Sequence, residues 1–462
     1  MHTRAANQRD AISEGDRAAA ARAAYERSAG VAGFDHTEVA ETRLSRPERY
    51  RQLFAALSAP QVISRGAGLN YCLASASRDG HSVLSTQFDR FLGFDDETGV
   101  VRVEPGVTLG ALFEFAVARN LLPPVLPGYP LITAGGAVAM NIHGKNQFRA
   151  GNFGDHVHGL TLYHPGKGEF LCGPNVNADL FRLTVGGFGL TGHITSVDIA
   201  LAPLPGTQAV IERHTVPNLV EAGHLMEKVS GDCEYTYSWH NLNLRGKSFG
   251  AGTVYTERHS GGGAAMARRD VSPSAMKPLP FRAYNRLTVP LLCSGYQVKE
   301  RLSPRKMTCG LFRAFFPFVG KELYFRMYGR KGFREYQALF PRERWDEACG
   351  RVAEAVGRSG ALIMLASIKV FRGERKLLNF SGEGICLALD TPNTPAADRL
   401  FSLLDEITVE LGGLANISKD GRLSAASVRR MYGGQYDEFR DKLRNYDPEQ
   451  RFQSELRRRL DV

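Results

Sequence analysis

Short apolar runs separated by glycine-rich turns begin at about residue 45. Strands are predicted where β-branched and other apolar residues cluster over about four positions. These runs are 61–64, 82–85 and 100–103. A helix is predicted over 109–119, because Thr108 stands at a capping position before an apolar periodic stretch. Residues 122–159 carry many glycines and almost no periodicity, which is typical of a long functional loop.

Helical and alternating patterns mix in the rest of the chain. Helices are predicted at 178–185, 343–357, 394–411 and 436–445. Strands are predicted at 193–202, 249–255, 322–328, 362–371 and 384–390. Strands and helices thus share each half of the chain, and Pro203, Pro205 and Gly206 mark a boundary between the halves.

The chain has 462 residues, which is too long for one ordinary core. We expect a polar leader over 1–44, a first domain over 45–206, a second domain over 207–411 and a C-terminal segment over 412–462. The leader is rich in Ala and Arg and has no apolar core of a secretory signal. It is expected to be a polar helix or disordered. No apolar run approaches the length of a membrane-spanning helix.

Charge is concentrated in one segment. The 58 Lys and Arg exceed the 48 Asp and Glu by ten, and residues 261–340 alone hold 15 basic and 4 acidic side chains. A solvated basic face explains this excess, and so does a surface that meets a membrane, a nucleic acid or a phosphorylated substrate. Apolar pairs such as Leu291-Leu292 and Phe315-Phe316 favour an anionic lipid partner. We find no nucleic-acid-binding motif.

Seven cysteines are scattered without CxxC pairs. Free thiols in a reducing cytoplasm are expected, rather than disulfides or a metal site.

Gly187–Gly192 reads GFGLTG and matches the dinucleotide fingerprint GxGxxG. A Rossmann turn requires a strand before these glycines and a helix after them. Here a helix is predicted before them and a strand after them, so the segment is not expected to bind NAD. Its glycines still permit close backbone approach to a planar or charged group.

Three glycine-rich loops are candidates for such a group. They are RGAGLNY at 65–71, LPGYPLITAGGAVAMNIHGKN at 126–146 and GGFGLTGHI at 186–194. Successive backbone N–H groups in the first loop form an anion nest suited to a diphosphate. Each loop taken alone is also explained by ordinary turns.

Taken together, the three loops resemble the flavin domain of vanillyl-alcohol-oxidase-type (PCMH-type) enzymes. The segment HGKNQFRAGNFGDHV at 143–157 resembles the decaprenylphosphoryl-β-D-ribose 2′-oxidase family, as do LFRLTVGGFGLTG, YTYSWHNL, LASIKVF and GEGICLALD further along. The resemblance covers roughly residues 45–462. It implies an α+β fold with a PCMH-type FAD-binding domain, completed by the C-terminal segment, and a central sheet-and-helix substrate domain.

The resemblance also implies an activity and partners. The activity is FAD-dependent oxidation of the 2-hydroxyl of a polyprenyl-phospho-ribose to the 2-keto sugar. This is the first half of epimerisation to the arabinose donor of arabinan biosynthesis in the cell wall, and a separate NAD(P)H-dependent keto-sugar reductase would complete it. A cytoplasmic location, peripheral at the inner face of the membrane, is expected.

Individual positions follow from the same resemblance. The cofactor-binding residues it implies are Ser64, Arg65, Gly66, Ala67, Gly68, Leu69, Asn70, Tyr71, Gly128, Thr133, Ala134, Gly135, Gly136, Met140, Asn141, Ile142, His143, Ile194 and Asn416. The residues expected to face the substrate are Lys369, Cys386 and Trp239, and the catalytic candidates are Lys419, His143 and Tyr71.

Two departures from the family pattern and one position bearing on flavin attachment stand out. Asn416 stands where the family has a flavin-contacting tyrosine, and Asn70-Tyr71-Cys72 replaces Ser-Tyr-Gly. Leu69 stands where relatives that tether FAD carry a histidine. Since leucine is unreactive, FAD is expected to be noncovalent.

Each catalytic candidate has a chemical role and a plainer alternative. Lys419 would stabilise the negative charge that develops as hydride arrives, or belong to an exposed turn with Asp420. His143 would polarise the hydroxyl or hold the substrate phosphate, or be structural. Tyr71 would relay a proton, or simply pack on the flavin.

The substrate-facing candidates also have alternatives. Lys369 would anchor an anionic substrate, or be solvated at a strand end. Cys386 is by default a small buried side chain.

Two other functions remain open from the sequence. One is an FAD-dependent oxidase or dehydrogenase of a soluble sugar, aldonolactone or polyol. The other is a non-catalytic flavin-carrying subunit.

Overall fold

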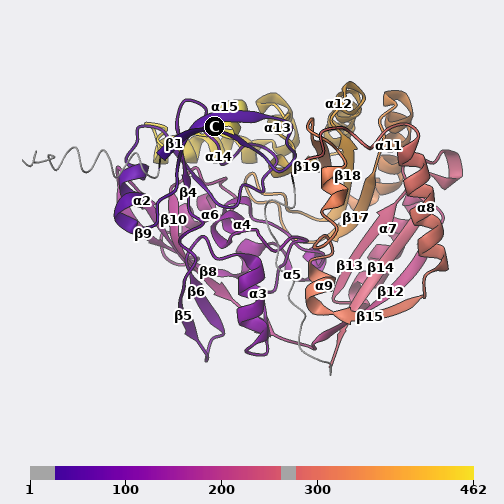
Figure 1. Ribbon diagram of the computed structural model, residues 1–462, viewed down its shortest axis with the longest axis horizontal. Helices are drawn as coiled ribbons and strands as arrows, with labels where there is room; N and C mark the ends of the chain where they lie inside the picture. The colour runs from indigo at the N-terminus through magenta and orange to yellow at the C-terminus, as the bar shows by residue number, and fades with distance from the viewer. Residues whose placement is uncertain (1–25, 262–276) are drawn as a thin grey trace, which may run out of the picture.

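The computed structural model describes residues 26–261 and 277–462, and it divides into two halves (Figure 1). The half shown on the left holds the early strands and, in yellow, the last helices of the chain. The half on the right holds the central strands and helices. Sheets and helices are mixed in both halves, which confirms the α+β class.

Two sheets build the first half. One has the order β1-β2-β4-β3, and its strands are β1 (Glu26–Ala32), β2 (Val39–Ser45), β3 (Val62–Arg65) and β4 (His81–Leu84). The other has the order β5-β6-β10-β8-β9, and its strands are β5 (Phe91–Asp95), β6 (Val100–Val103), β8 (Val157–His164), β9 (Gly168–Cys172) and β10 (His193–Ala200). The strands predicted near 61–64, 82–85, 100–103 and 193–202 are thereby confirmed.

The leader predicted over 1–44 is wrong for its second part. Residues 26–45 form β1 and β2, which pair antiparallel with Glu26 opposite Ser45. Ala40, Thr42 and Leu44 alternate with exposed residues and are buried, so β2 has the pattern of a half-buried strand. Residues 1–25 lie outside the described residues.

Short helices connect these strands. They are α2 (Tyr50–Leu57), α3 (Leu109–Val117), α4 (Ala134–Met140), α5 (Gln147–Ala150) and α6 (Ala178–Thr184). Thr108 caps α3 as predicted, because its Oγ1 accepts a hydrogen bond from Ala111 N at 3.2 Å. The irregular loop predicted over 122–159 is wrong in part, since it contains α4, α5 and a 3-10 turn, η1 (Phe153–His156), and ends in β8.

Two four-stranded antiparallel sheets build the second half. One has the order β13-β14-β12-β15, with β12 (Gln208–Val216), β13 (Tyr235–His240), β14 (Gly252–Ser260) and β15 (Lys306–Gly310). The other has the order β17-β18-β16-β19, with β16 (Phe333–Phe340), β17 (Leu365–Phe371), β18 (Gly384–Pro392) and β19 (Leu414–Ala415). Ser238 of β13 accepts a hydrogen bond from Ile368 N of β17 at 2.8 Å, so the two sheets lie edge to edge.

Three helices cover one face of these joined sheets (Figure 1). They are α7 (Leu219–Val229), α11 (Trp345–Ser359) and α12 (Pro395–Glu410). Their buried side chains, including Met226, Trp345 and Phe401, belong to one continuous core with the sheets. The opposite face of the sheets is therefore free to line a cavity.

The basic segment folds largely into helices. From residue 277 onward it contains α8 (Thr288–Leu302), α9 (Leu311–Phe315) and α10 (Leu323–Arg326). The strand predicted at 322–328 is wrong, because Tyr324 and Tyr328 pack as successive turns of a helical segment, with their hydroxyls 2.7 Å apart. Residues 262–276 of the basic segment lie outside the described residues.

The C-terminal segment returns to the first half. It contains α13 (Ala425–Tyr432), α14 (Gly434–Tyr446) and α15 (Glu455–Leu460). Val62 N donates to Arg451 O at 2.8 Å, and Gln453 N donates to Val62 O at 2.9 Å. The C-terminal segment thus supports β3, the strand that leads into the first glycine loop.

Candidate active site

A cavity of about 840 Å³ lies between the two halves. All three glycine-rich loops line it on the side of the first half, and β13, β16, β17 and β18 line it on the other. Helix α8 and the residues that follow β15 also line it. The structure therefore places most of the predicted cofactor and substrate residues around one space.

The first loop presents unpaired backbone donors to this cavity. The N–H groups of residues 67–70 have no hydrogen-bond partner within the described chain, while Asn70 O accepts from Phe34 N at 2.9 Å. Gly68 adopts φ +72°, a left-handed conformation that favours glycine. A Cβ at Gly66 would lie 2.2 Å from Thr133 Oγ1, so glycine is needed where the first two loops meet.

A histidine beside the third loop has an unused ring nitrogen. His193 is buried, and its Nδ1 lies 2.8 Å from Ser64 Oγ. Burial lowers the pKa of His193 to about 4, so the ring is neutral near pH 7. Its Nε2 has no partner in the described chain although it is fully buried. A buried polar atom of this kind is normally paired, so it fits a ligand in the cavity.

The GxGxxG segment has the context predicted for it. Helix α6 precedes Gly187 and strand β10 follows Gly192, which is the reverse of a Rossmann turn. Phe188 and Gly189 both have positive φ, at +58° and +76°, and both line the cavity.

Lys419 is held by a carboxylate at the edge of the cavity. Its Nζ lies 3.2 Å from Glu335 Oε2 and 4.0 Å from the centre of the Tyr71 ring. Burial alone would raise the pKa of Glu335, but the charges of Lys419 and Lys369 outweigh it and hold that pKa below its usual value. Lys419 is thus not an exposed turn residue.

Glu335 faces a second carboxyl group across the sheet. Glu335 of β16 pairs directly with Asp390 of β18, and both line the cavity. Burial and the charge of Glu335 raise the pKa of Asp390 well above its usual value. Tyr324 donates a hydrogen bond to Asp390 Oδ2 at 2.8 Å. The pair therefore carries one negative charge, which resides on Glu335 beside Lys419.

Gln337 links His143 to this group. Its Oε1 accepts from Asn416 Nδ2 at 2.8 Å and lies 3.4 Å from His143 Nε2, and its Nε2 donates to Glu335. Burial and the charge of Lys369 lower the pKa of His143 to about 3. His143 is consequently neutral near pH 7 and contacts a substrate as a polar, uncharged group.

Tyr71 packs in the same aromatic wall. It contacts Phe34 and Phe333 with ring centres 5.3 and 5.6 Å away. Burial and the charge of Glu335 raise its pKa well above the usual value. The hydroxyl therefore remains protonated and donates hydrogen bonds without ionising.

Two more lysines lie further into the substrate side. Lys145 Nζ donates to Ala314 O at 2.6 Å and lies 4.0 Å from the centre of the Tyr237 ring, and burial lowers its pKa. Lys369 lines the cavity and has no carboxylate within ion-pair distance in the described chain. Trp239 lines the cavity beside Tyr296, with ring centres 4.7 Å apart.

Three predicted site residues do not line the cavity. Arg65 turns away and donates to Ser75 Oγ and Ala32 O at 3.0 and 2.9 Å. Ala134, within the second loop at the start of α4, is fully buried. Cys386 is fully buried, and burial raises the pKa of its thiol to about 12, whereas Ala388, two residues along the same strand face, lines the cavity.

The sequence reasoning missed Glu335, Gln337 and Asp390. Their signal is the polar alternation REYQ in an otherwise apolar strand, and a lone acid at the end of GICLALD. All seven cysteines are free, as predicted.

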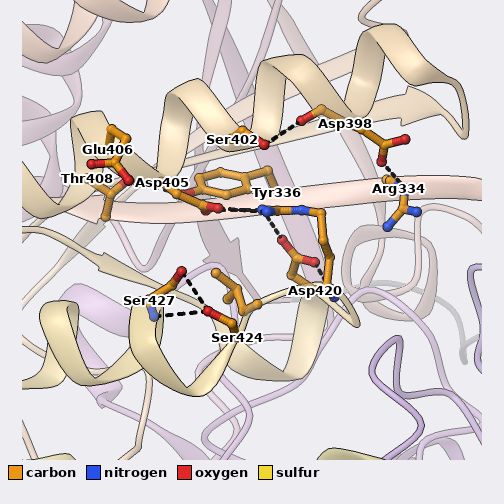
Figure 2. Close-up of polar contacts among 12 residues, drawn as sticks. Arg334, Tyr336, Asp398, Ser402, Asp405, Glu406, Thr408, Asp420, Ser424 and Ser427 are labelled. Atoms are coloured by element: carbon orange, nitrogen blue, oxygen red, sulfur yellow. Dashed lines mark hydrogen bonds and ion pairs between the residues drawn. The ribbon is translucent and has the colours of Figure 1, made fainter. Parts of the chain in front are cut away.

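A polar network on the other face of β16 fixes these side chains. Tyr336 points away from the cavity and donates to Asp405 Oδ1 of α12 at 3.0 Å (Figure 2). Arg422 donates to Asp405 Oδ2 at 2.6 Å and to Asp420 Oδ2 at 2.9 Å. Asp420 follows Lys419 directly, so this network holds the lysine and β16 at a fixed separation.

These features fit a flavin dinucleotide. The free N–H groups of residues 67–70 suit its diphosphate, and the unpaired Nε2 of His193 and the close-packed glycines suit its length and flat ring. Leu69 offers no nucleophilic atom, so noncovalent retention stays a prediction.

Comparison with known proteins supports FAD as the cofactor. Residues 52–173 match the family model of the FAD binding domain. The chain is 29% identical over 420 residues to decaprenylphosphoryl-β-D-ribose oxidase of Mycolicibacterium smegmatis, which covers 87% of this chain and 89% of that protein. D-lactate dehydrogenase of Anaerostipes hadrus is 32% identical over 31% of this chain and 32% of its own length. A glycolate oxidase subunit of Bacillus subtilis is 27% identical over 32% of this chain and 33% of its own length.

The fold, the cavity and these matches define an FAD-dependent oxidoreductase that acts on hydroxyl groups. Its residues 52–173 match the FAD binding domain model, and this domain resembles that of the vanillyl-alcohol-oxidase-type oxidoreductases. The chain is similar to the decaprenylphosphoryl-β-D-ribose oxidases.

Proposed function

We propose that this enzyme oxidises the 2-hydroxyl of a polyprenyl-phospho-ribose to the 2-keto sugar. The observation that carries the proposal is Lys369, a cation on the cavity wall without an ion-pair partner in the described chain. Lys419 is neutralised by Glu335, and Lys145 is bonded to a carbonyl. Lys369 is therefore the cation in this group that suits a substrate phosphate.

The similarity supports the same substrate class. It covers 87% of this chain, more than the first half alone, so it reaches the second half, which supplies Lys369, Trp239 and α8. The two hydroxy-acid enzymes match only about a third of this chain. Aromatic residues that line the cavity from β13 and β14, among them Tyr237, Trp239 and Tyr255, suit an apolar chain attached to the phosphate.

Each residue then has a defined task. Bound FAD supplies the hydride acceptor. Lys419 stabilises negative charge that develops near its Nζ, and Glu335 keeps that lysine in place. Neutral His143 positions the sugar hydroxyl, and the ionised Glu335 is the carboxylate proposed to accept its proton.

The keto product requires a second enzyme for epimerisation. We propose a separate NAD(P)H-dependent keto-sugar reductase as the partner, which returns hydride to the other face of C2 and yields the arabinose donor used for cell-wall arabinan. The FAD enzyme itself then needs only to release the keto sugar.

An anaerobic assay tests the proposed substrate. The purified holoenzyme is mixed with polyprenyl-phospho-ribose, ribose 5-phosphate or free sugars, and loss of the flavin absorbance is followed. We expect rapid bleaching by the lipid-linked sugar and slow or no bleaching by the others. Equal or faster bleaching by a free sugar or aldonolactone, with peroxide formed in air, would replace the proposal with a soluble-sugar oxidase.

A further inference from the structure

Helix α8 has two apolar stripes. Val289 and Cys293 are buried on its inner side. On the opposite side Leu291, Val298 and Leu302 are exposed by 73%, 53% and 81%. Positions separated by four and seven residues share one face of a helix. A surface helix usually buries its single apolar stripe, so the outer stripe of α8 lacks a covering partner in the described chain.

Exposed apolar side chains concentrate around this helix. Of the twelve large hydrophobic residues exposed in the described ranges, eight lie between residues 281 and 323. Leu287, exposed by 84%, precedes α8 and extends its outer stripe by one turn. We call Leu287, Leu291, Val298 and Leu302 the α8 face. Such a concentration marks a contact surface rather than scattered surface residues.

Cations surround the α8 face at both ends. A second cavity of about 660 Å³ opens beside Leu287, and its lining contains four basic and no acidic side chains. These are Arg282, Arg286, Lys331 and Arg399. Arg301 lies near the other end of the helix, where it is exposed and has no ion-pair partner among the described residues.

The catalytic cavity opens beside the same helix. Leu292, Tyr296 and Lys299 of α8 line it and are solvent-exposed. Arg313 and Lys321 complete this exposed rim. Figure 1 shows α8 at the periphery of the second half, away from the first half.

We propose that the α8 face docks on a bilayer that contains anionic phospholipids. Its apolar stripe would enter the headgroup region, and the surrounding cations would meet lipid phosphates. A second copy of the chain suits this surface poorly, because a symmetric contact would set one cationic rim against the other. A bilayer supplies both the apolar interior and the negative charge that the surface lacks.

Docking in this way would also serve catalysis, a consequence that rests on the proposed function. The cavity rim lies beside the docking surface on the same helix, so a lipid-linked sugar would enter without leaving the membrane. No helix in the described ranges has the length and apolarity to cross a bilayer. The proposed attachment is therefore peripheral.

Vesicle sedimentation tests the proposal without any sugar lipid. The full-length holoenzyme is mixed with phosphatidylcholine vesicles, with or without phosphatidylglycerol. We expect strong binding only to the anionic vesicles, with a several-fold loss at high salt. The double variant Leu291→Gln, Leu302→Gln should bind at least tenfold more weakly. The control Leu92→Gln, Leu171→Gln alters leucines that are also exposed but lie on the first half, and it should bind normally.

A charge variant separates electrostatic attraction from insertion. Arg282→Gln, Arg286→Gln should weaken binding several-fold and flatten the salt dependence, while Arg51→Gln, an exposed arginine on α2, should do neither. Equal binding by the α8 variants and the controls would overturn the proposal. So would a dimer in solution that the α8 variants dissociate. The flavin absorbance spectrum of each variant needs no substrate and reports the cofactor site independently of membrane binding.

Discussion

Lys419 illustrates how a lysine becomes functional through its surroundings. Its ammonium group lies between the carboxylate of Glu335 and the face of Tyr71. Together these contacts hold the ammonium group in one position at the edge of the cavity. A fixed charge of this kind costs no reorganisation when negative charge develops beside it.

We therefore expect Lys419→Ala to lower the rate of sugar oxidation by about a thousandfold or more. FAD should remain bound, because the loop N–H groups and His193 are unchanged. Stopped-flow reduction and the flavin absorbance of the purified variant measure the two effects. Lys442→Ala, which removes an exposed lysine paired with Glu438, is the control and should be fully active. Near-normal turnover of Lys419→Ala would remove the proposed role.

At the residue scale the sequence predicts which loops carry the site but not the partners of each side chain. Lys419, His143 and Lys369 follow from the family resemblance, and the structure brings them to one cavity. Glu335 and Gln337 could not be predicted, because their role depends on the strand pairing. This pairing places Glu335 opposite Asp390 and beside Lys419. Cys386 was expected to face the substrate but is buried outside the cavity lining. An alternating pattern shows which strand face a residue occupies, but not whether that position reaches the cavity.

At the element scale, β16 is held between the cavity and α12. Alternate residues of this strand have different tasks, because Glu335 and Gln337 face the cavity while Tyr336 contacts Asp405. Arg422 connects Asp405 to Asp420, and both of these carboxylates are buried. The arginine is thus the sole basic partner the described chain gives these two acids.

Arg422→Met should be strongly destabilising. It keeps most of the side-chain volume but leaves two buried carboxylates without a cation, which costs about 3 to 5 kcal/mol. Arg430→Met breaks the neighbouring exposed pair with Glu406 and should cost at most about 1 kcal/mol. Thermal unfolding followed by flavin fluorescence compares the two variants. Similar melting temperatures for both would contradict the buried network.

Long periodic elements are predicted well from the sequence and short ones poorly. Helices α11 and α12 have clear apolar faces and fall close to their predicted ranges. The segment at 322–328 contains several aromatic residues and has high strand propensity, but tertiary packing of Tyr324 and Tyr328 makes it helical. Strands β1 and β2 were missed because the Ala- and Arg-rich residues before them dominate the composition.

At the scale of the whole molecule, the site exists only because distant segments meet. Residues 64–70, 143, 369 and 419 come from both halves and from the C-terminal segment. Periodicity and spacing do not specify such long-range contacts, so only the resemblance predicted the arrangement. The same assembly buries several polar groups that the separate segments would leave in water, which makes the fold sensitive to pH.

Two buried histidines, His193 and His240, set the direction of this sensitivity. Burial lowers the pKa of each to about 4, below the value of about 6.5 in an unfolded chain. Between these values the unfolded state binds more protons, so the free energy of unfolding falls as the pH is lowered through this range. Each of the two histidines should lower the free energy of unfolding by about 2 kcal/mol when the pH falls to about 5.

His240→Gln isolates one of these contributions, because His240 lies outside the cavity lining and its ring contacts Gly250 O, which a glutamine amide can also bond. Melting temperatures at about pH 7.5 and about pH 5 should differ less in this variant than in the unaltered protein, since one proton-binding group of the unfolded state is gone. His158→Gln replaces an exposed histidine and should leave the difference unchanged. If both variants show the full loss, burial of His240 does not contribute to acid lability, and carboxyl groups such as Glu335 must account for it.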